Sequence, residues 1–341
     1  MRICHVNLAR GFSGGEQQTL NLLLGLAERG VEQRLVCYRG GELASRARAA
    51  GIEIRELGHY LRGHRQPEPC DLIHAHCGRS VYWAAIEHRL RATPYVITRR
   101  VDNPLHQTFT TRWSYQHAAR VVCLSRAIKA VVHQCLGPVK TAIIPSTYST
   151  FSADPEQVAA IRQRWPGKLL VGQVGKLLLH KGHDTTLAAA QTLASSHPQL
   201  QFLILGDGPR RAELAQRATD LPNVSLLGHQ QQIGNYIAAL DLFLFPSLSE
   251  GLGSSILEAM QAGVPVIGSN AGGIPDLIEH GSSGILVPAG DGPALATAIA
   301  RLADDPERRQ QLVAAARQAL AQFSPTTMTD RYLALYHQLI D

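Results

Sequence analysis

The segment LFLFPSLSEGLGSSILEAM, residues Leu242–Met260, holds the pattern that decides the fold of this chain. It starts with an apolar run, Leu242–Phe245, that is typical of a short buried strand. A loop with Gly251 and Gly253 follows, and apolar residues then recur at helical spacing over Ser254–Gln261. A buried strand that leads through a glycine-rich loop into a helix is the repeating unit of a parallel sheet joined by crossover helices. The segment therefore predicts an α/β fold.

Similar strand and helix patterns alternate along the rest of the chain, which supports the same architecture. In the first part we expect strands at Arg2–Leu8, Gln33–Tyr38, Ile52–Leu57, Asp71–His76, Tyr95–Thr98, Arg120–Leu124 and Thr141–Ile144. In the second part we expect strands at Leu169–Val174, Gln201–Leu205, Val224–Leu227, Leu242–Phe245, Val264–Gly268 and Gly284–Val287. Helices are expected at Glu16–Arg29, Asp184–Ser195, Arg210–Ala218, Ser254–Gln261, Pro293–Ala303, Pro306–Gln322 and Thr326–Ile340.

The length of 341 residues exceeds what one hydrophobic core usually serves, so we expect two domains. A polar, turn-rich stretch at Pro145–Pro155 is the expected linker. We predict two doubly wound, Rossmann-like domains, residues 1–150 and 151–323, that face each other across a cleft. A C-terminal helix at residues 324–341 is expected to pack back toward the first domain. Ligands are expected at the carboxyl ends of the strands, where such folds bind them.

The composition excludes several classes of protein. Apolar residues make up 45% of the chain and charged residues 18%, which is inconsistent with a disordered chain, a coiled coil or a collagen-like repeat. No apolar run reaches the ~18 to 20 residues of a membrane helix, and Met1–Ala9 is too polar and too short for a signal peptide. The six cysteines form no C-x-x-C pair, which favours a reducing compartment. We therefore expect a cytoplasmic protein.

Charge is distributed unevenly along the chain. Residues 1–150 contain 20 Lys and Arg against 10 Asp and Glu, a balance of +10, whereas the remainder contains 13 against 17, a balance of −4. A basic half is typical of a protein that meets an anionic partner, such as a phosphorylated substrate or a phospholipid surface, although solvated arginines would give the same balance. No basic motif interleaved with aromatic residues is present, so we expect no nucleic-acid partner.

Two strand-to-helix loops carry groups that are suited to phosphate. The first places Gly14 and Gly15 directly before Glu16, where the N-terminus of a helix offers unpaired N–H groups to an anion. This loop matches neither G-x-G-x-x-G nor G-x-x-x-x-G-K-[ST], so a dinucleotide site and a Walker P-loop are both disfavoured. The second contains Lys176 and Lys181, two of only five lysines in the chain. Their charges could converge on one dianionic group, for which a pyrophosphate is suited.

A third loop, within Leu242–Met260, and the helix that follows it carry one carboxylate each. Glu250 lies beside the loop glycines, whereas Glu258 lies inside the following helix, so the two acids would contact different parts of a ligand. Carboxylates accept hydrogen bonds from pairs of vicinal hydroxyls, which is the chemistry needed to hold a ribose or a hexose. The glycines bring backbone amides close to the same place.

Together, the three loops resemble those of the retaining, GT-B-fold glycosyltransferases of family 4. The resemblance covers nearly the whole chain and rests on the Gly14-Gly15 loop, the Gly-Lys-x4-Lys-Gly loop and the spacing of seven residues between Glu250 and Glu258. The stretch Gly272–Asp276 is similar to the family's downstream loop. The resemblance implies a transfer of sugar from a UDP- or GDP-linked donor with no cofactor. It also implies that the first domain binds the acceptor and the second domain binds the nucleotide sugar.

The resemblance implies a role for each matching residue. The donor diphosphate would be held by Gly14, Gly15, Lys176 and Lys181, the donor sugar would be contacted by Glu250, and the ribose would be held by Glu258. The other implied substrate-binding positions are Gly208 and Leu227 near the base, and Gly251, Leu252, Gly253 and Ser254 at the start of the helix.

The first domain departs from the family pattern at the end of the strand Tyr95–Thr98. Arg99 and Arg100 follow this strand, where many relatives carry a histidine beside the sugar. The candidates for the catalytic groups of this domain are His76, at the end of another strand, and Arg99 or Arg100. We assign His76 and Arg100 as catalytic, together with Glu250.

No metal site is expected. The segment Cys70–Cys77 contains cysteines and histidines, but side chains alternate between faces along a strand, so four ligands there would not form one tetrahedron. The sequence also lacks a D-x-D pair that would hold a divalent ion on a diphosphate. Lys176, Lys181 and backbone amide dipoles would then meet the charge of the leaving group.

We therefore expect a metal-independent glycosyltransferase that acts with retention in the assembly of a cell-envelope glycan or lipopolysaccharide. The basic residues Arg62, His64, Arg65, Arg99 and Arg100 favour an anionic saccharide or glycolipid acceptor, with peripheral contact at the cytoplasmic face of the inner membrane. Alternatives are a sugar-nucleotide epimerase or phosphorylase of the same fold, and a non-catalytic sugar-nucleotide-binding protein. A transferase would slowly hydrolyse its donor without an acceptor, whereas a binding protein would only saturate.

Overall fold

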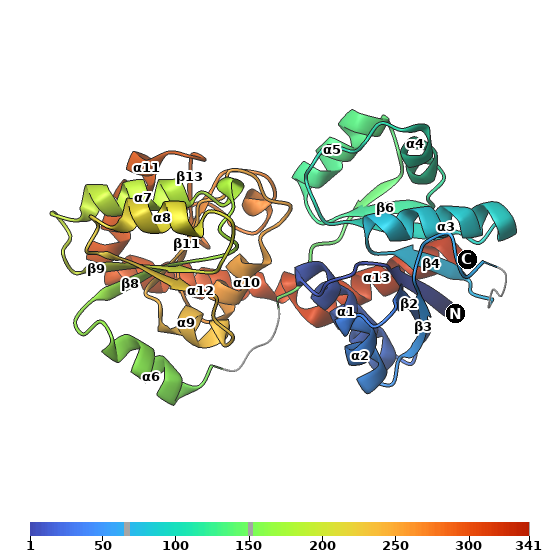
Figure 1. Ribbon diagram of the computed structural model, residues 1–341, viewed down its shortest axis with the longest axis horizontal. Helices are drawn as coiled ribbons and strands as arrows, with labels where there is room; N and C mark the ends of the chain where they lie inside the picture. Colours follow the sequence, from blue (N-terminus) through green and yellow to red (C-terminus); the bar gives the residue numbers. More distant parts are fainter. Residues whose placement is uncertain (65–68, 149–152, 341) are drawn as a thin grey trace. The chain divides into compact units, whose positions relative to one another are not determined.

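The computed structural model describes residues 1–64, 69–148 and 153–340, and the chain forms two compact units (Figure 1). One unit comprises Met1–Thr147 together with Phe323–Asp341, and the other comprises Tyr148–Gln322. Of the residues proposed to meet the acceptor, Arg65 lies outside the described residues, as does part of the expected linker, residues 149–152.

The first unit is built on a parallel sheet of seven strands in the order β3-β2-β1-β4-β5-β6-β7. The strands are β1 (Arg2–Asn7), β2 (Glu32–Tyr38), β3 (Glu53–Leu57), β4 (Leu72–Ala75), β5 (Tyr95–Arg99), β6 (Arg120–Cys123) and β7 (Thr141–Ile143). The helices are α1 (Gly14–Glu28), α2 (Glu42–Ala49), α3 (Gly78–Arg91), α4 (Phe109–Gln116), α5 (Arg126–Leu136) and, from the end of the chain, α13 (Pro325–Ile340).

The second unit is built on a parallel sheet of six strands in the order β10-β9-β8-β11-β12-β13. The strands are β8 (Leu169–Val174), β9 (Leu200–Leu205), β10 (Val224–Gly228), β11 (Leu242–Phe245), β12 (Val266–Ser269) and β13 (Ile285–Val287). The α-helices are α6 (Pro155–Gln163), α7 (His183–Leu193), α8 (Arg211–Ala218), α9 (Ile233–Ala239), α10 (Ser254–Gln261), α11 (Gly292–Asp304) and α12 (Pro306–Ala319). Short 3-10 turns occur at η1 (Leu179–Lys181), η2 (Ile274–Asp276) and η3 (Leu320–Phe323).

These two sheets confirm the predicted class of two doubly wound α/β units, and the expected strands all occur with ends that shift by at most two residues. The largest shift is at β12, which begins at Val266 rather than at Val264. The Val264 N–H donates to the carbonyl of Ala259, which closes the end of α10, and Pro265 has no N–H to offer a strand partner. The strand can therefore begin only after the proline.

The C-terminal helix α13 packs against α1 and shares the core of the first unit. Met328, Tyr332 and Tyr336 of α13 lie with strand residues such as Ile3 and Leu72 in one buried cluster. Arg29, the residue that follows α1, forms a 2.6 Å ion pair with Asp330 at the edge of this contact. The two tyrosine hydroxyls thereby reach the strands of the sheet.

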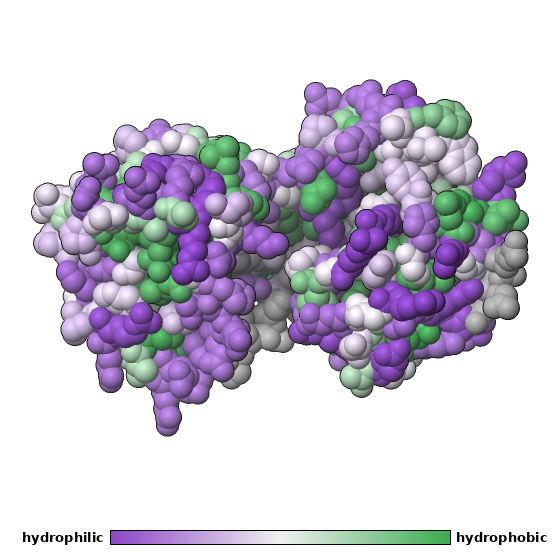
Figure 2. All heavy atoms as spheres, viewed as in Figure 1, coloured by the Kyte–Doolittle hydropathy of each residue, from purple (hydrophilic) through white to green (hydrophobic). Residues whose placement is uncertain are grey.

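The carboxyl ends of parallel strands share one edge of each sheet, so the loops that follow the strands gather there. The face of the molecule in Figure 2 is mostly hydrophilic, with small apolar patches scattered over it. Within the described ranges, no helix combines the length and apolarity that crossing a membrane requires.

Candidate functional site

Lys181 and Glu250 lie together at the carboxyl edge of the second sheet. The Lys181 ammonium forms an ion pair with the Glu250 carboxylate and lies 5.5 Å from the centre of the Phe245 ring. Both charged side chains are about four-fifths buried, with exposed fractions of 21% and 19%. The backbone of the lysine is also held, because the buried Gln173 Nε2 donates to the Lys181 carbonyl at 2.8 Å. Lys181, predicted to hold the diphosphate, and Glu250, predicted to contact the donor sugar, are therefore direct neighbours.

Lys176 lies on the same loop but is exposed, and no described residue forms an ion pair with it. The structure thus gives the two lysines of this loop different surroundings. Lys181 is held in a fixed position by its partners, whereas the ammonium of Lys176 is available to an incoming anion.

The downstream loop Gly272–Asp276 positions the backbone of Glu250. Gly273 N–H donates to the Glu250 carbonyl at 2.8 Å. Gly272 has a left-handed backbone with φ of +53°, and a Cβ atom there would lie 2.2 Å from the Glu250 oxygen. Only glycine permits this approach, which explains why two glycines stand together in this part of the sequence.

The predicted amide-bearing residues at the start of α10 are mostly enclosed. Gly251, Leu252 and Gly253 are buried, and the half-buried Ser254 is the first residue of the helix. Gly253 precedes the helix with φ of +91°. The loop therefore turns sharply into α10 within four residues of Glu250, as a strand-to-helix loop of a ligand site does.

Glu258 lies one turn further along α10 and is half-buried. No hydrogen bond to its carboxylate comes from the described residues, and burial raises the pKa of this carboxyl to about 7. An acid that is desolvated without a partner is typical of a functional position, because hydroxyl donors of a ligand would supply what the protein does not.

Gly208 lies on the loop that follows β9, and Leu227 is the next-to-last residue of the adjacent strand β10. Gly206 N–H donates to the Gly228 carbonyl at 2.8 Å and joins the start of the loop after β9 to the end of β10. Gly208 N–H donates to its neighbour Asp207 at 2.7 Å, and the Leu227 carbonyl accepts from Gln230 at 2.7 Å. Both predicted base-contacting positions thus lie at the same sheet edge as the charged pair.

In the first unit, Gly15 and Arg100 are brought together. Gly14 and Gly15 are the first two residues of α1, and a Cβ atom at Gly15 would lie 3.4 Å from the Arg100 Cδ atom, while one at Gly14 would meet no protein atom within 4 Å. Arg100 follows β5, and its Nε atom is buried without a hydrogen-bond partner among the described residues. Burial lowers the pKa of the Arg100 guanidinium, and no described carboxylate forms an ion pair with it. A cation held in this way beside a helix N-terminus is suited to an anionic ligand.

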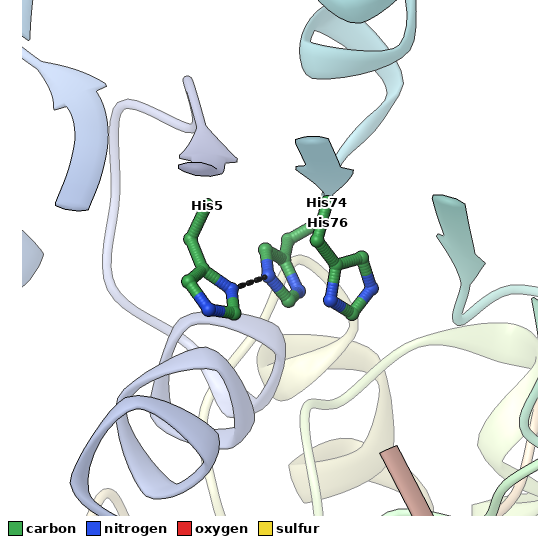
Figure 3. Close-up of side chains that lie close together, drawn as sticks. All are labelled: His5, His74 and His76. Carbon is green, nitrogen blue, oxygen red and sulfur yellow. Dashed lines mark hydrogen bonds between the residues drawn. The ribbon is translucent and has the colours of Figure 1, made fainter. Parts of the chain in front are cut away.

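His76 lies next to this arginine and belongs to a cluster of three buried histidines (Figure 3). His5 and His74 face each other across the β1 and β4 ladder, and His76 follows β4 two residues later on the same face. The Nδ1 atom of His5 lies 3.0 Å from the Nε2 atom of His76, and the Arg100 guanidinium lies 3.4 Å from the His76 Nδ1 atom. Because arginine can only donate, His76 accepts at Nδ1 and donates from Nε2 to His5.

The remaining ring of the cluster is tied to the C-terminal helix. The Nδ1 atom of His74 lies 2.6 Å from the Tyr336 hydroxyl, and its Nε2 atom lies 2.7 Å from the Thr98 hydroxyl. Burial lowers the pKa of all three imidazoles, that of His5 to about 3, so the cluster is neutral at physiological pH. The Nε2 atom of His5 is buried and has no described partner.

This cluster contains a third histidine that the sequence-based reasoning about metals did not include. His74 and His76 share a face, and among the described residues one ring nitrogen from each of His5, His74 and His76 lies within 4.8 Å of the other two, close enough for a metal ion to be considered. A metal bound to all three would have to displace a hydrogen bond of His74 and place positive charge beside Arg100. The contacts therefore fit a hydrogen-bonded support for Arg100 better than a metal site.

His5 is the residue that sequence reasoning missed. A histidine in the first apolar strand resembles an ordinary core residue, and only the adjacency of β1 and β4 brings it to His76. No local pattern in the sequence signals this adjacency.

Two protein-family models match this chain, one over each unit. "Glycosyltransferase Family 4" matches residues 12–150, and "Glycosyl transferases group 1" matches residues 158–319. The chain belongs to the family 4 glycosyltransferases. This assignment confirms the resemblance found in the sequence, and the protein is therefore a glycosyltransferase.

This glycosyltransferase has relatives of similar length. It is 29% identical to the lipopolysaccharide core biosynthesis glycosyltransferase LpsD of Rhizobium meliloti, with 98% of each chain covered. It is 28% identical to the 2-deoxystreptamine glucosyltransferase of Streptomyces kanamyceticus, over 71% of this chain and 70% of the relative. Its fold matches that of Anabaena Alr3699/HepE in complex with UDP and glucose, with a TM-score of 0.85 over 99% of this chain and 100% of that chain at 22% identity. The GT-B fold predicted from the sequence is thereby confirmed.

Proposed function

We propose that this glycosyltransferase takes a sugar from a nucleoside diphosphate sugar, UDP- or GDP-linked, and transfers it with retention to a saccharide or glycolipid acceptor of the cell envelope. The observation that carries the proposal is the ion pair of Lys181 and Glu250 at the carboxyl edge of the second sheet. Without ligand the two charges satisfy each other. A diphosphate sugar offers each of them a separate partner, since its phosphate would take the ammonium and its sugar hydroxyls would take the carboxylate.

The chemical demand of this transfer is electrostatic. Negative charge grows on the departing phosphate while the anomeric carbon becomes oxocarbenium-like. In the second unit, Lys176 and Lys181 are assigned to the phosphate, Glu250 to the sugar and Glu258 to the ribose. Transfer then needs no metal ion to hold the diphosphate.

In the first unit we assign Arg100 and the amides of Gly14 and Gly15 to an anion, which is the leaving phosphate in this proposal. Arg100 would touch the reacting group, whereas His76 holds the guanidinium through the 3.4 Å contact and is a positioning residue in this scheme. The neutral state of His76 supports this division of roles, because a second positive charge at that ring would repel Arg100.

The cell-envelope role is proposed from the relative LpsD, which is named for lipopolysaccharide core biosynthesis, and from the +10 charge balance of residues 1–150. Both favour an anionic acceptor and peripheral contact with the cytoplasmic face of a membrane. Of the basic residues assigned to this partner, His64 forms a 2.6 Å contact with the buried Glu87 and therefore supports the fold instead.

The donor assignment is tested by titration calorimetry with UDP and GDP, followed by product analysis with the corresponding sugar nucleotides. Lys181→Met should weaken nucleotide binding at least tenfold. Lys168→Met is the matched control, because Lys168 directly precedes β8, away from the Lys181 loop that follows this strand, and its ammonium donates to the Pro198 carbonyl at 2.6 Å. Equal affinities for both variants and the wild type would overturn the diphosphate assignment.

A further inference from the structure

The first unit carries a cavity of about 740 Å³ between α3, α4 and the turn that follows β3. Helices α3 and α4 pack side by side (Figure 1). The walls of this aromatic groove include Tyr60, Tyr82, Phe109 and Trp113, with the hydroxyl groups of Thr108 and Ser114 between them. Phe109 is 80% exposed, although a ring of this size usually packs against protein. The groove therefore offers aromatic faces and hydrogen-bonding groups together.

A smaller cavity of about 270 Å³ adjoins the aromatic groove. This cationic pocket is lined by Arg10 after β1, Arg79 at the start of α3, and His59 and Tyr60 after β3. Tyr60 lines both cavities and thus forms their common wall. Arg10 also lies four residues before Gly14, on the loop that leads into α1.

The charged side chains that line the two cavities are basic. None of the described residues that line them is acidic, while Arg89 and His106 add basic groups to the groove. Neither Arg10 nor Arg79 forms an ion pair with a described carboxylate, and the Arg10 guanidinium lies 5.3 Å from the centre of the Tyr38 ring. Elsewhere in the same unit, by contrast, Arg2, Arg34 and Arg91 each pair with a glutamate. Arg10 and Arg79 thus present their charges to the smaller cavity without a carboxylate partner among the described residues.

The wall formed by the turn after β3 is held in place by contacts with α3. The Trp83 indole N–H donates to the Arg62 carbonyl at 3.1 Å, and one nitrogen of His64 lies 2.9 Å from the Tyr60 carbonyl. On the opposite wall, the Tyr82 hydroxyl lies 3.0 Å from the Thr111 hydroxyl. The site is therefore largely preformed, which reduces the entropy lost on binding.

We infer that these two cavities form the acceptor site and that the acceptor is an oligosaccharide carrying a phosphate or carboxylate group. The anionic group enters the cationic pocket between Arg10 and Arg79, where charge-assisted hydrogen bonds fix it. The sugar rings lie against Tyr60, Phe109 and Trp113, because an aromatic face packs against the C–H face of a sugar while nearby hydroxyls bind its hydroxyl groups. The inference rests on the proposed function and specifies the chemistry of its second substrate.

A sugar fits the groove better than a lipid chain. An acyl chain is matched by aliphatic walls, but this groove mixes aromatic rings with threonine and serine hydroxyls and an arginine. Polar groups of this kind would lose their hydrogen bonds to water if a hydrocarbon covered them. Binding of a membrane surface is therefore the rival outcome of the test.

The test uses the full-length protein labelled with ¹⁵N at its tryptophans, of which there are three. Indole signals are assigned by single Trp→Phe variants and followed during titration with maltotriose, glucose or glucose 6-phosphate. Maltotriose and glucose 6-phosphate should shift the Trp113 signal and leave that of Trp165, in the second unit, unchanged. Glucose 6-phosphate should bind at least tenfold more tightly than glucose.

Two variants at exposed positions separate the two cavities. Arg79→Gln should weaken glucose 6-phosphate at least fivefold and leave maltotriose unchanged, whereas Phe109→Ala should do the reverse. The controls are Arg112→Gln and Leu90→Ala, which change exposed residues outside the two cavity linings.

UDP affinity, measured in the same samples, distinguishes the possible failures. Intact UDP binding with no response of Trp113 to either sugar would overturn the acceptor site alone. Loss of UDP binding in the wild type would overturn the proposed function. Co-sedimentation with phosphatidylglycerol vesicles that depends on Phe109 and Arg79, without any sugar response, would assign the groove to a membrane surface and refute the inference.

Discussion

Replacing Glu258 by glutamine should stabilise the protein at high pH, because the ionised carboxylate of Glu258 lowers the free energy of unfolding. The half-buried side chain receives no hydrogen bond from the described residues, and burial raises its pKa from 4.5 to about 7. At 1.36 kcal/mol per pH unit, this displacement corresponds to about 3 kcal/mol. The ionised form is therefore the costly one, and a ligand that donates hydrogen bonds to it would recover part of that energy.

The sign of the pH dependence follows from the direction of the shift. Because the folded-state pKa lies above the unfolded value, the native protein binds this proton more tightly than the unfolded chain does. The contribution to stability is fully present below about pH 4.5 and is lost as the pH rises through about 7. Glutamine has no proton to lose. Glu258→Gln should therefore match the wild type near about pH 5 and be more stable by about 2 to 3 kcal/mol near about pH 8.5.

The measurement is urea unfolding of wild type and variant across this pH range, with UDP affinity determined in parallel. Glu279→Gln is the matched control, because Glu279 is an exposed acid in the same unit. UDP should bind the Glu258→Gln variant at least tenfold more weakly at the higher pH, since the amide accepts fewer hydrogen bonds from ribose hydroxyls. A stability difference that does not change with pH, or a variant less stable than the wild type at every pH, would refute this reasoning.

Further predictions concern the other groups of the site. Lys181→Met should raise the Kd for UDP about 10- to 100-fold, which corresponds to the loss of about 1.5 to 3 kcal/mol, and calorimetry would contradict this if the affinity did not change. Gly272→Ala should lower both the melting temperature and kcat, because the new Cβ would displace the Glu250 backbone; an unaltered melting curve would argue against that contact. Arg100→Gln should lower kcat about 100-fold in steady-state kinetics, and an unchanged kcat would remove Arg100 from the reaction. EDTA should leave the rate of transfer intact, whereas a full loss restored by Mg²⁺ or Mn²⁺ would show that a metal takes part.

The strands and the phosphate-suited loops could be predicted because their signals are local. The run Leu242–Phe245 forms β11 with the predicted ends, and the glycine-rich loop leads into α10 at Ser254 as expected. Short apolar runs, glycines and helix-forming residues act within a few positions of one another, so neighbouring side chains suffice to specify them. The two-unit α/β class followed from repeating the same local pattern.

The contacts within the site could not be predicted in the same way. Lys181 and Glu250 are 69 positions apart in the sequence, and their ion pair exists because β8 and β11 are neighbours in the sheet. His74 meets Tyr336 across 262 positions, because the C-terminal helix returns to the first sheet. The reasoning from Cys70–Cys77 considered ligands within one strand only and therefore did not include His5 from the neighbouring strand.

The sequence by itself determined the α/β class, the positions of the strands and the loops that carry Gly15, Lys181 and Glu250, because hydrophobic periodicity and turn chemistry act over short distances along the chain. Only the tertiary structure decided which of these groups touch. It paired Lys181 with Glu250, placed Arg100 beside Gly15 and His76, and brought α3, α4 and the turn after β3 together around the aromatic groove. The physical reason is that strand order and helix packing are set by burial over the whole unit, and many local sequences are compatible with each arrangement.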